Sequence, residues 1–357
     1  MRAIPLVLGI LIVAAVVWLA VSMRGGPEPD VVLYCGVDPD QSQRLVDDFR
    51  EASGLVVDYH GETEAFRSIG LPQRIEAERD RPRGDVWWSN EIMHMVDLAS
   101  KGLIDKLPEG MAGKFPQAWR DPGGRYIQFG ARARVLLVNT VLVPDPADHP
   151  KSVRDLLDPK WAQRDLLTTM AVPLTGTTYT HAVAWLTRDE TDGWAFFEAV
   201  RKAADAGHMK LVKSNGQVMS AVADTSRRVA FGLTDTDDAW IAINELKAPV
   251  TIIYPDQGPD EPGALLIPNT AGLITGRPHP EAAVKLLEWL ASPELEQALA
   301  FSRSAQIPVR PGVGVPPDGH VKRPGLEFRA EEVDWTKVGA NRDRWRDRLA
   351  ALLQRGD

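Results

Sequence analysis

The chain contains a single cysteine, Cys35, among its 357 residues. A disulfide within the chain and a cysteine-based zinc cluster are therefore excluded. Seven histidines are present, but none forms the His-Glu-x-x-His pattern of zinc hydrolases. The sequence also shows no internal repeat and no low-complexity tract. These absences argue against a repeat protein and against a disordered one.

Positive charge is in deficit, with 41 Lys and Arg against 49 Asp and Glu and a net charge of −8. An acidic body argues against a nucleic-acid-binding protein, which presents basic surface to phosphates. Hydrophobic content of 44% and charged content of 25% are ordinary for a globular protein. The length is sufficient for two hydrophobic cores, so two domains or lobes are expected.

The longest apolar run lies at the N-terminus, where Ala3–Met23 reads AIPLVLGILIVAAVVWLAVSM between two arginines. It is long enough to span a bilayer, which takes about 20 apolar residues. Ala20 and Ser22 also offer the small side chains of a signal-peptide cleavage site. Residues 1–26 are therefore predicted to be either a transmembrane anchor or a cleaved signal. Both place the body in the periplasm or on the extracytoplasmic face of the membrane.

Strands and helices alternate after the Gly/Pro linker at 24–30. Strands are expected at Val31–Tyr34, Leu55–Tyr59 and Asp85–Trp88, with helices at Gln41–Ala52 and Leu71–Arg79 between them. This order predicts an α/β fold in which helices cover a parallel sheet.

The alternation continues toward the C-terminus. Ser152 is placed to cap a short helix at Val153–Leu157. Further strands are expected at Arg134–Asn139, Val229–Leu233 and Val250–Tyr254, and further helices at Thr180–Leu186, Trp194–Ala203, Pro280–Ser292 and Asn341–Leu353.

Polar side chains follow several of these strands, where ligands bind in open α/β sheets. Thr177, Tyr179 and Asn215 lie at predicted helix starts, whose N–H groups can hold an anion. The other candidate ligand-binding residues are mostly acids, namely Asp38, Glu62, Glu64, Asn90, Glu91, Asp235, Asp237 and Asp238. The alternative for each acid is a solvated turn or a helix cap.

Two further pairs of residues are open to more than one interpretation. Trp87 and Trp88 point to opposite faces of one strand, so one is expected in the core and the other at a cleft wall. Arg132 and Arg134 flank a predicted crossing strand, where they can reach an anionic solute or pair with nearby acids. Cys35 is expected to be a small packed residue.

Taken together and in order, several segments after residue 30 resemble the type II periplasmic binding proteins, in the branch of ferric-iron-binding or family 1 extracellular solute-binding proteins. The segments are LYCGVD at 33–38, GETEAFRSIGLPQRIEAERDRPRGDVWWSNE at 61–91, ARARVLLVNT at 131–140, PLTGTTYTHAVAW at 173–185, KSNGQV at 213–218, GLTDTDDA at 232–239, LIPNTAGLITGRPHPEAAVKLLEWLASPE at 266–294 and QIPVRPG at 306–312.

The resemblance implies a two-lobed α/β fold that closes over a solute without catalysing a reaction. One lobe would comprise 27–137 and the return at 268–357, and the other 138–267. The implied role is the extracytoplasmic solute-binding component of an ABC importer. Its expected partners are a small solute or metal ion, the permease subunits and, through the N-terminal segment, the membrane. No nucleic-acid partner is expected, and the protein is expected to be a monomer.

The chain departs from the ferric pattern at the metal ligands that the resemblance would imply. Asp38 stands where ferric members have a histidine, and Asn90, followed by Glu91, stands where they have an acid. Asp237 and Asp238 replace their tyrosine pair. Carboxylates suit iron or another hard cation, so Asp38, Glu91, Asp237 and Asp238 are candidate metal ligands, without ferric specificity. Because gathered carboxylates repel one another, the solute is predicted to carry positive charge, as a metal ion, a chelate or an amine.

Two other functions remain as alternatives. A metal-dependent glycosyltransferase-like enzyme could use Asp235 and Asp237 on a nucleotide-sugar, although no nucleotide-binding glycine motif accompanies them. An anchored sensory domain would bind a solute without transporting it.

Overall fold

A computed structural model describes residues 28–62, 70–317, 319 and 321–354. The predicted anchor or signal over 1–26 lies outside these residues, and so does Glu64. Within the described part of the chain, no helix is long and apolar enough to cross a membrane.

The strands form one mixed sheet in the order β2-β1-β3-β9-β4-β7-β5-β6, with β8 paired to β4. The strands are β1 Val31–Cys35, β2 Val57–Gly61, β3 Val86–Ser89, β4 Tyr126–Asn139, β5 Leu167–Ala171, β6 Met209–Val212, β7 Val229–Asp235, β8 Val250–Ile253 and β9 Leu266–Leu273. The expected parallel arrangement holds for β1 with β2 and β3, and for β5 with β6 and β7. It is wrong for β4 and β9, which pair antiparallel because they carry the chain between the two halves in opposite directions.

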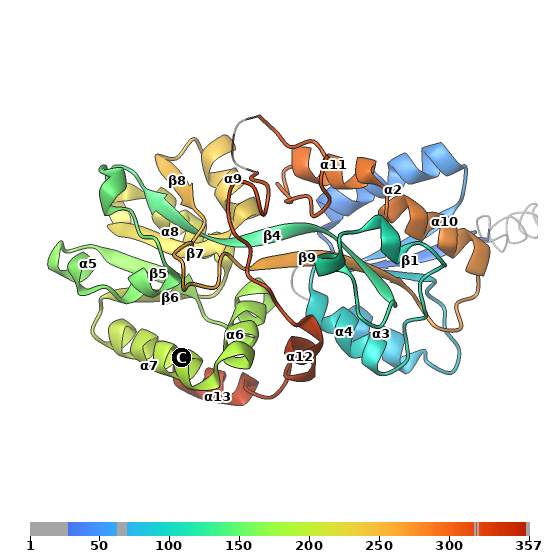
Figure 1. Ribbon diagram of the computed structural model, residues 1–357, viewed down its shortest axis with the longest axis horizontal. Helices are drawn as coiled ribbons and strands as arrows, with labels where there is room; N and C mark the ends of the chain where they lie inside the picture. Colours follow the sequence, from blue (N-terminus) through green and yellow to red (C-terminus); the bar gives the residue numbers. More distant parts are fainter. Residues whose placement is uncertain (1–27, 63–69, 318, 320, 355–357) are drawn as a thin grey trace, which may run out of the picture.

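Strand β4 belongs to both halves of the molecule (Figure 1). Its first part, Tyr126–Ala133, pairs with β9, and its second part, Arg134–Val138, pairs with β7. The first half of the sheet is therefore β1, β2, β3 and β9, and the second half is β5 to β8. A register shift at Gly130, whose φ is 37°, bends β4 inside the first half.

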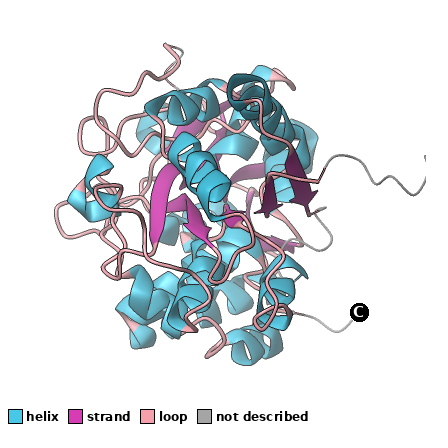
Figure 2. Cartoon of the chain, turned by 90° about the vertical axis from the view of Figure 1, so that its right-hand side faces the viewer, coloured by secondary structure: helices cyan, strands magenta, loops and turns pink. Residues whose placement is uncertain are grey.

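Helices cover both faces of the sheet (Figure 2). They are α2 Pro39–Ser53, α3 Gly70–Ala77, α4 Ile92–Ser100, α5 Pro159–Gln163, α6 Gly176–Arg188, α7 Glu190–Asp205, α8 Asn215–Ala223, α9 Thr236–Asn244, α10 Pro280–Leu290, α11 Pro293–Phe301, α12 Trp335–Ala340 and α13 Arg346–Leu353. The segment Val153–Leu157 is a 3-10 helix, and Ser152 caps it as predicted. Asp155 completes a capping box, which the sequence analysis does not predict.

Both adjacent tryptophans of β3 are in the core, with 1% of Trp87 and none of Trp88 exposed. Helices α4 and α10 pack on this part of the sheet. Successive side chains of a strand point to opposite faces, so in a strand covered on both faces neighbouring residues are both buried. The Trp88 indole packs beside Phe129 and donates to the Asn269 side chain at 3.4 Å. The expectation that one of the pair forms a cleft wall is wrong for this reason.

The C-terminal strap, residues 335–353, contacts both halves. It contains two helices, α12 and α13, rather than the single helix expected over Asn341–Leu353, because a turn at 341–345 separates them. Helix α12 packs against α4 and α6, and α13 packs against α7. In the turn, the Arg342 guanidinium donates to Asp97 of α4 at 2.8 Å, while the backbone carbonyl of Arg342 accepts a hydrogen bond from the Tyr179 hydroxyl of α6.

Candidate functional site

A cleft of about 1140 Å³ lies between the two halves. The first half contributes α2, the start of α3, the β3–α4 turn and the end of α11. The second half contributes the starts of α6, α8 and α9. Arg132 of β4 lines the cleft between them. Side chains from both halves therefore face one cleft, whose volume is slightly above the range of about 300–1,000 Å³ that small-molecule sites commonly have.

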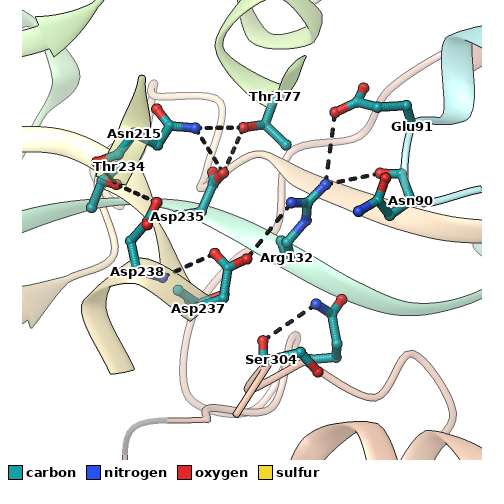
Figure 3. A network of polar contacts seen from close by, with 12 residues as sticks. Asn90, Glu91, Arg132, Thr177, Asn215, Thr234, Asp235, Asp237, Asp238 and Ser304 are labelled. Carbon is teal, nitrogen blue, oxygen red and sulfur yellow. Dashed lines mark hydrogen bonds and ion pairs between the residues drawn. The ribbon is translucent and has the colours of Figure 1, made fainter. Parts of the chain in front are cut away.

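Asp235 at the end of β7 fixes the wall of the second half (Figure 3). Its Oδ1 accepts from Arg134 Nη1 at 2.5 Å. Its Oδ2 accepts from the Thr177 hydroxyl at 2.5 Å and from the Asn215 amide at 2.9 Å. Arg134 is fully buried and Asp235 is 2% exposed. A buried charge needs such partners, so this network joins β4 and β7 to the starts of α6 and α8.

Asp237 and Asp238 lie in the first turn of α9 and face the cleft. Asp238 accepts from the Thr234 hydroxyl at 2.9 Å, and its backbone N–H donates to Asp237 at 3.0 Å. Burial raises the pKa of Asp237 to about 6, although Arg132 opposes the shift. Burial and the charge of Asp237 raise the pKa of Asp238 well above its ordinary value. The two carboxyl groups therefore resist carrying full charge together.

Arg132 and Glu91 meet where the halves face each other (Figure 3). Arg132 Nη2 donates to the Asn90 carbonyl at 2.9 Å. The guanidinium lies 3.7 Å from a carboxylate oxygen of Glu91 on one side and 3.7 Å from one of Asp237 on the other. Burial raises the pKa of Glu91, and Arg132 counteracts that rise. Burial acts to lower the pKa of Arg132, but Asp237 and the other nearby acids outweigh it and raise the pKa overall.

Most of the predicted site residues come together in this cleft. The lining includes Asp38, Asn90, Glu91, Thr177, Asn215, Asp235, Asp237 and Asp238. Glu62 and Tyr179 are not among the residues that line it. Glu62 instead accepts the backbone N–H of Leu71 in α3. Tyr179 lies on the face of α6 that meets the strap, with the Arg346 guanidinium 4.4 Å from its ring centre.

Sequence reasoning missed the rim of the cleft. Arg44, Lys213 and Arg303 line it, and Arg303 pairs with Glu245 of the second half at 2.6 Å. Arg303 follows α11, which reaches the cleft only after the chain has returned to the first half. No local pattern in the sequence indicates that placement.

Cations already accompany these acids. Arg134, which is fully buried, is paired with Asp235, and Arg132, which lines the cleft, lies between Glu91 and Asp237. With two arginines among the acids and raised pKa values at Asp237 and Asp238, the carboxylates do not need a bound cation to limit their repulsion. The positive charge expected on the solute therefore stays a prediction.

Comparison with known proteins places these features in a family context. Residues 40–301 match the family model described as bacterial extracellular solute-binding protein. Iron uptake protein A1 of Synechocystis is 24% identical over 321 residues, which are 88% of this chain and 84% of that protein. A putative 2-aminoethylphosphonate-binding periplasmic protein of Salmonella typhimurium is 24% identical over 292 residues, 80% of this chain and 79% of that protein.

Solved structures show the same fold. Iron-bound HitA from Pseudomonas aeruginosa superposes with a TM-score of 0.74 at 22% identity, covering 89% of this chain and 98% of that one. This similarity supports the mixed α/β periplasmic-binding-protein fold that the sequence predicts.

Proposed function

The chain belongs to the bacterial extracellular solute-binding proteins, and on that premise we propose that it captures its solute in the cleft lined by Arg132. It is the extracytoplasmic binding component of an ABC importer and not an enzyme, so the glycosyltransferase alternative is wrong. We further propose that the two halves act as lobes, the first of residues 27–137 and the return within 268–357 and the second of 138–267, while the C-terminal helices contact both. The loaded protein passes its solute to the permease.

The observation that carries this proposal is that the side chains lining the cleft come from both lobes. Asp38 and Glu91 come from the first lobe, and Asn215 and Asp237 from the second. A solute that contacts both sets gains its full contacts only when the lobes are close together. Binding therefore favours the closed arrangement by the difference in contacts between the two states.

The solute that we propose is small and polar and carries a cationic group. Carboxyl groups of Asp38, Glu91, Asp237 and Asp238 face the cleft and can bind a metal ion, a chelate or an amine. Relatives are named for iron uptake and for 2-aminoethylphosphonate, so both inorganic and amine-bearing solutes occur among them. Because the chain lacks the tyrosine pair of ferric members, we propose no preference for iron over the other solutes of this class.

Native mass spectrometry of protein purified from its own host, with metal analysis alongside, tests this proposal. The double variant Asp237→Asn/Asp238→Asn should bind the identified solute more than about tenfold less tightly, since each charge-assisted hydrogen bond contributes about 1.5–3 kcal/mol. The matched control Asp47→Asn/Glu51→Gln removes two exposed acids of α2 outside the cleft and should bind like the parent.

Two outcomes would contradict the proposal. One is unchanged affinity in the Asp237→Asn/Asp238→Asn variant. The other is the absence of compaction in small-angle scattering when the parent protein is saturated with its solute.

A further inference from the structure

Arg132 is the charged side chain that lies between the acids of the two lobes. It extends from β4, the strand shared by both lobes, and its side chain is 12% exposed. Its guanidinium is 3.7 Å from Glu91 of the first lobe and 3.7 Å from Asp237 of the second. A metal ion held by both carboxylates would have to lie about 2.0–2.6 Å from an oxygen of each. The guanidinium therefore stands between the two groups that such an ion would need.

The neighbouring aspartates do not offer a complete metal site in its place. One oxygen each of Asp235, Asp237 and Asp238 lies within 4.8 Å of the others. Both oxygens of Asp235, however, accept hydrogen bonds from Arg134, Thr177 and Asn215. Of these three described aspartates, Asp237 and Asp238 remain to ligate an ion, next to the positive charge of Arg132.

Arg132 itself has donors to spare. A guanidinium carries five N–H groups in a planar fork. Within the described residues, one hydrogen bond is formed, to the Asn90 carbonyl at 2.9 Å, and both carboxylates are beyond hydrogen-bond distance. The buried Nε has no partner among these residues. Leaving such donors unpaired is unfavourable, and a carboxylate, phosphonate or phosphate satisfies two of them at once.

The other arginine of this strand provides the contrast. Arg134 is fully buried, and its Nε, like that of Arg132, has no partner among the described residues, but its two terminal nitrogens donate to Asp235, Thr177 and Thr178. It does not line the cleft, whereas Arg132 does. Arg134 holds the wall, and Arg132 faces the solute.

We propose that Arg132 is the specificity-determining residue of the cleft, because it bars a bare metal ion from Glu91 and Asp237 and requires an anionic group on the solute. This inference rests on the proposed function. Since Asp237 and Asp238 face the same space, the solute class is a small zwitterion. Its anionic group lies against Arg132 and its ammonium group against the two aspartates.

The first test measures the binding of Mn(II), used alone as the probe, to the full chain by isothermal titration calorimetry. Arg132→Gln should bind Mn(II) at least about tenfold more tightly than the parent, because the carboxylates lose their internal cation. Arg227→Gln removes an exposed arginine that lies outside the cleft and should behave like the parent. The triple variant Arg132→Gln/Asp237→Asn/Asp238→Asn should lose the gain.

Arg132→Met keeps the aliphatic stem and replaces Arg132→Gln if the latter does not fold. The proposal is overturned if the neutral variant at position 132 binds Mn(II) no more tightly than Arg227→Gln, or if the gain persists in the triple variant. The second test is the identity of the solute that co-purifies with the parent: a zwitterion supports the proposal, and a bare metal ion overturns it. Failure of the proposed function would appear separately, as a parent protein whose lobes do not close on that solute.

Discussion

The ion pair between Arg134 and Asp235 allows a quantitative test of how the cleft wall is built. The pair is 2.5 Å long, and its side chains are 0% and 3% exposed. Arg134→Met leaves the Asp235 carboxylate buried without its cation, and Asp235→Asn leaves the guanidinium buried without its anion. Each single variant should lose about 3–5 kcal/mol of unfolding free energy. The double variant removes both charges and should lose at least about 2 kcal/mol less than the two single losses together.

The expected changes are large enough to measure by calorimetry. Unfolding entropy near 60 °C is about 2.1 cal/mol/K per residue, which gives about 0.75 kcal/mol/K for a chain of this length. A loss of about 4 kcal/mol therefore lowers the melting temperature by about 5 °C. The exposed pair of Lys337 and Asp334 supplies the control, because Lys337→Gln should cost less than about 1 kcal/mol and shift the melting temperature by about 1 °C.

The double-variant cycle can refute the reasoning directly. Losses under about 1 kcal/mol in both single variants, adding up in the double variant, would mean that the charges are hydrated and act independently. The network of Asp235 with Thr177 and Asn215 would then not be the element that holds α6 and α8 in place.

Two further predictions concern single groups. The raised pKa of Asp237, about 6, means that the folded protein binds this proton more tightly than the unfolded chain, so stability is lost as pH rises from about 4 through 6. In differential scanning fluorimetry, Asp237→Asn should therefore have a higher melting temperature than the parent above pH 6 and the same melting temperature at pH 4. An equal difference in melting temperature at every pH would contradict this prediction. Burial raises the pKa of the Cys35 thiol to about 12, so it should react with a disulfide reagent at least about 100-fold faster in denaturant than in the native protein. Rapid labelling of the native protein would show that β1 opens readily.

The sequence predicts the fold best where one local pattern decides the structure. The strands at Val31–Cys35 and Val229–Asp235 are β-rich runs bounded by polar residues, and both are observed within two residues of their predicted ends. The first part of β4 was missed because Gly130, Arg132 and the alternating small residues there do not resemble a buried strand. Its pairing with β9, far along the chain, is what makes it one.

The same contrast between local patterns and long-range contacts applies to the site. That acids after strands gather in a cleft could be predicted, since strand ends meet at one edge of an α/β sheet. Which carboxylate oxygens stay available to a ligand could not be predicted, because their availability depends on partners that are distant in sequence. Asp235 is engaged by Arg134 from 101 residues away, and Glu62 is drawn toward α3 instead of the cleft.

The strap makes the two edges of the cleft mechanically unequal. On one side of β4, Arg342 joins α4 and α6, and α12 packs against both of these helices. On the other side, Arg303, which follows α11, and Glu245, which follows α9, meet as a surface pair with 52% and 38% of their side chains exposed. Salt weakens such a pair but not packed helices. Packed helices therefore hold one edge of the cleft and an exposed ion pair holds the other, so we expect raised ionic strength to loosen the edge with the ion pair first.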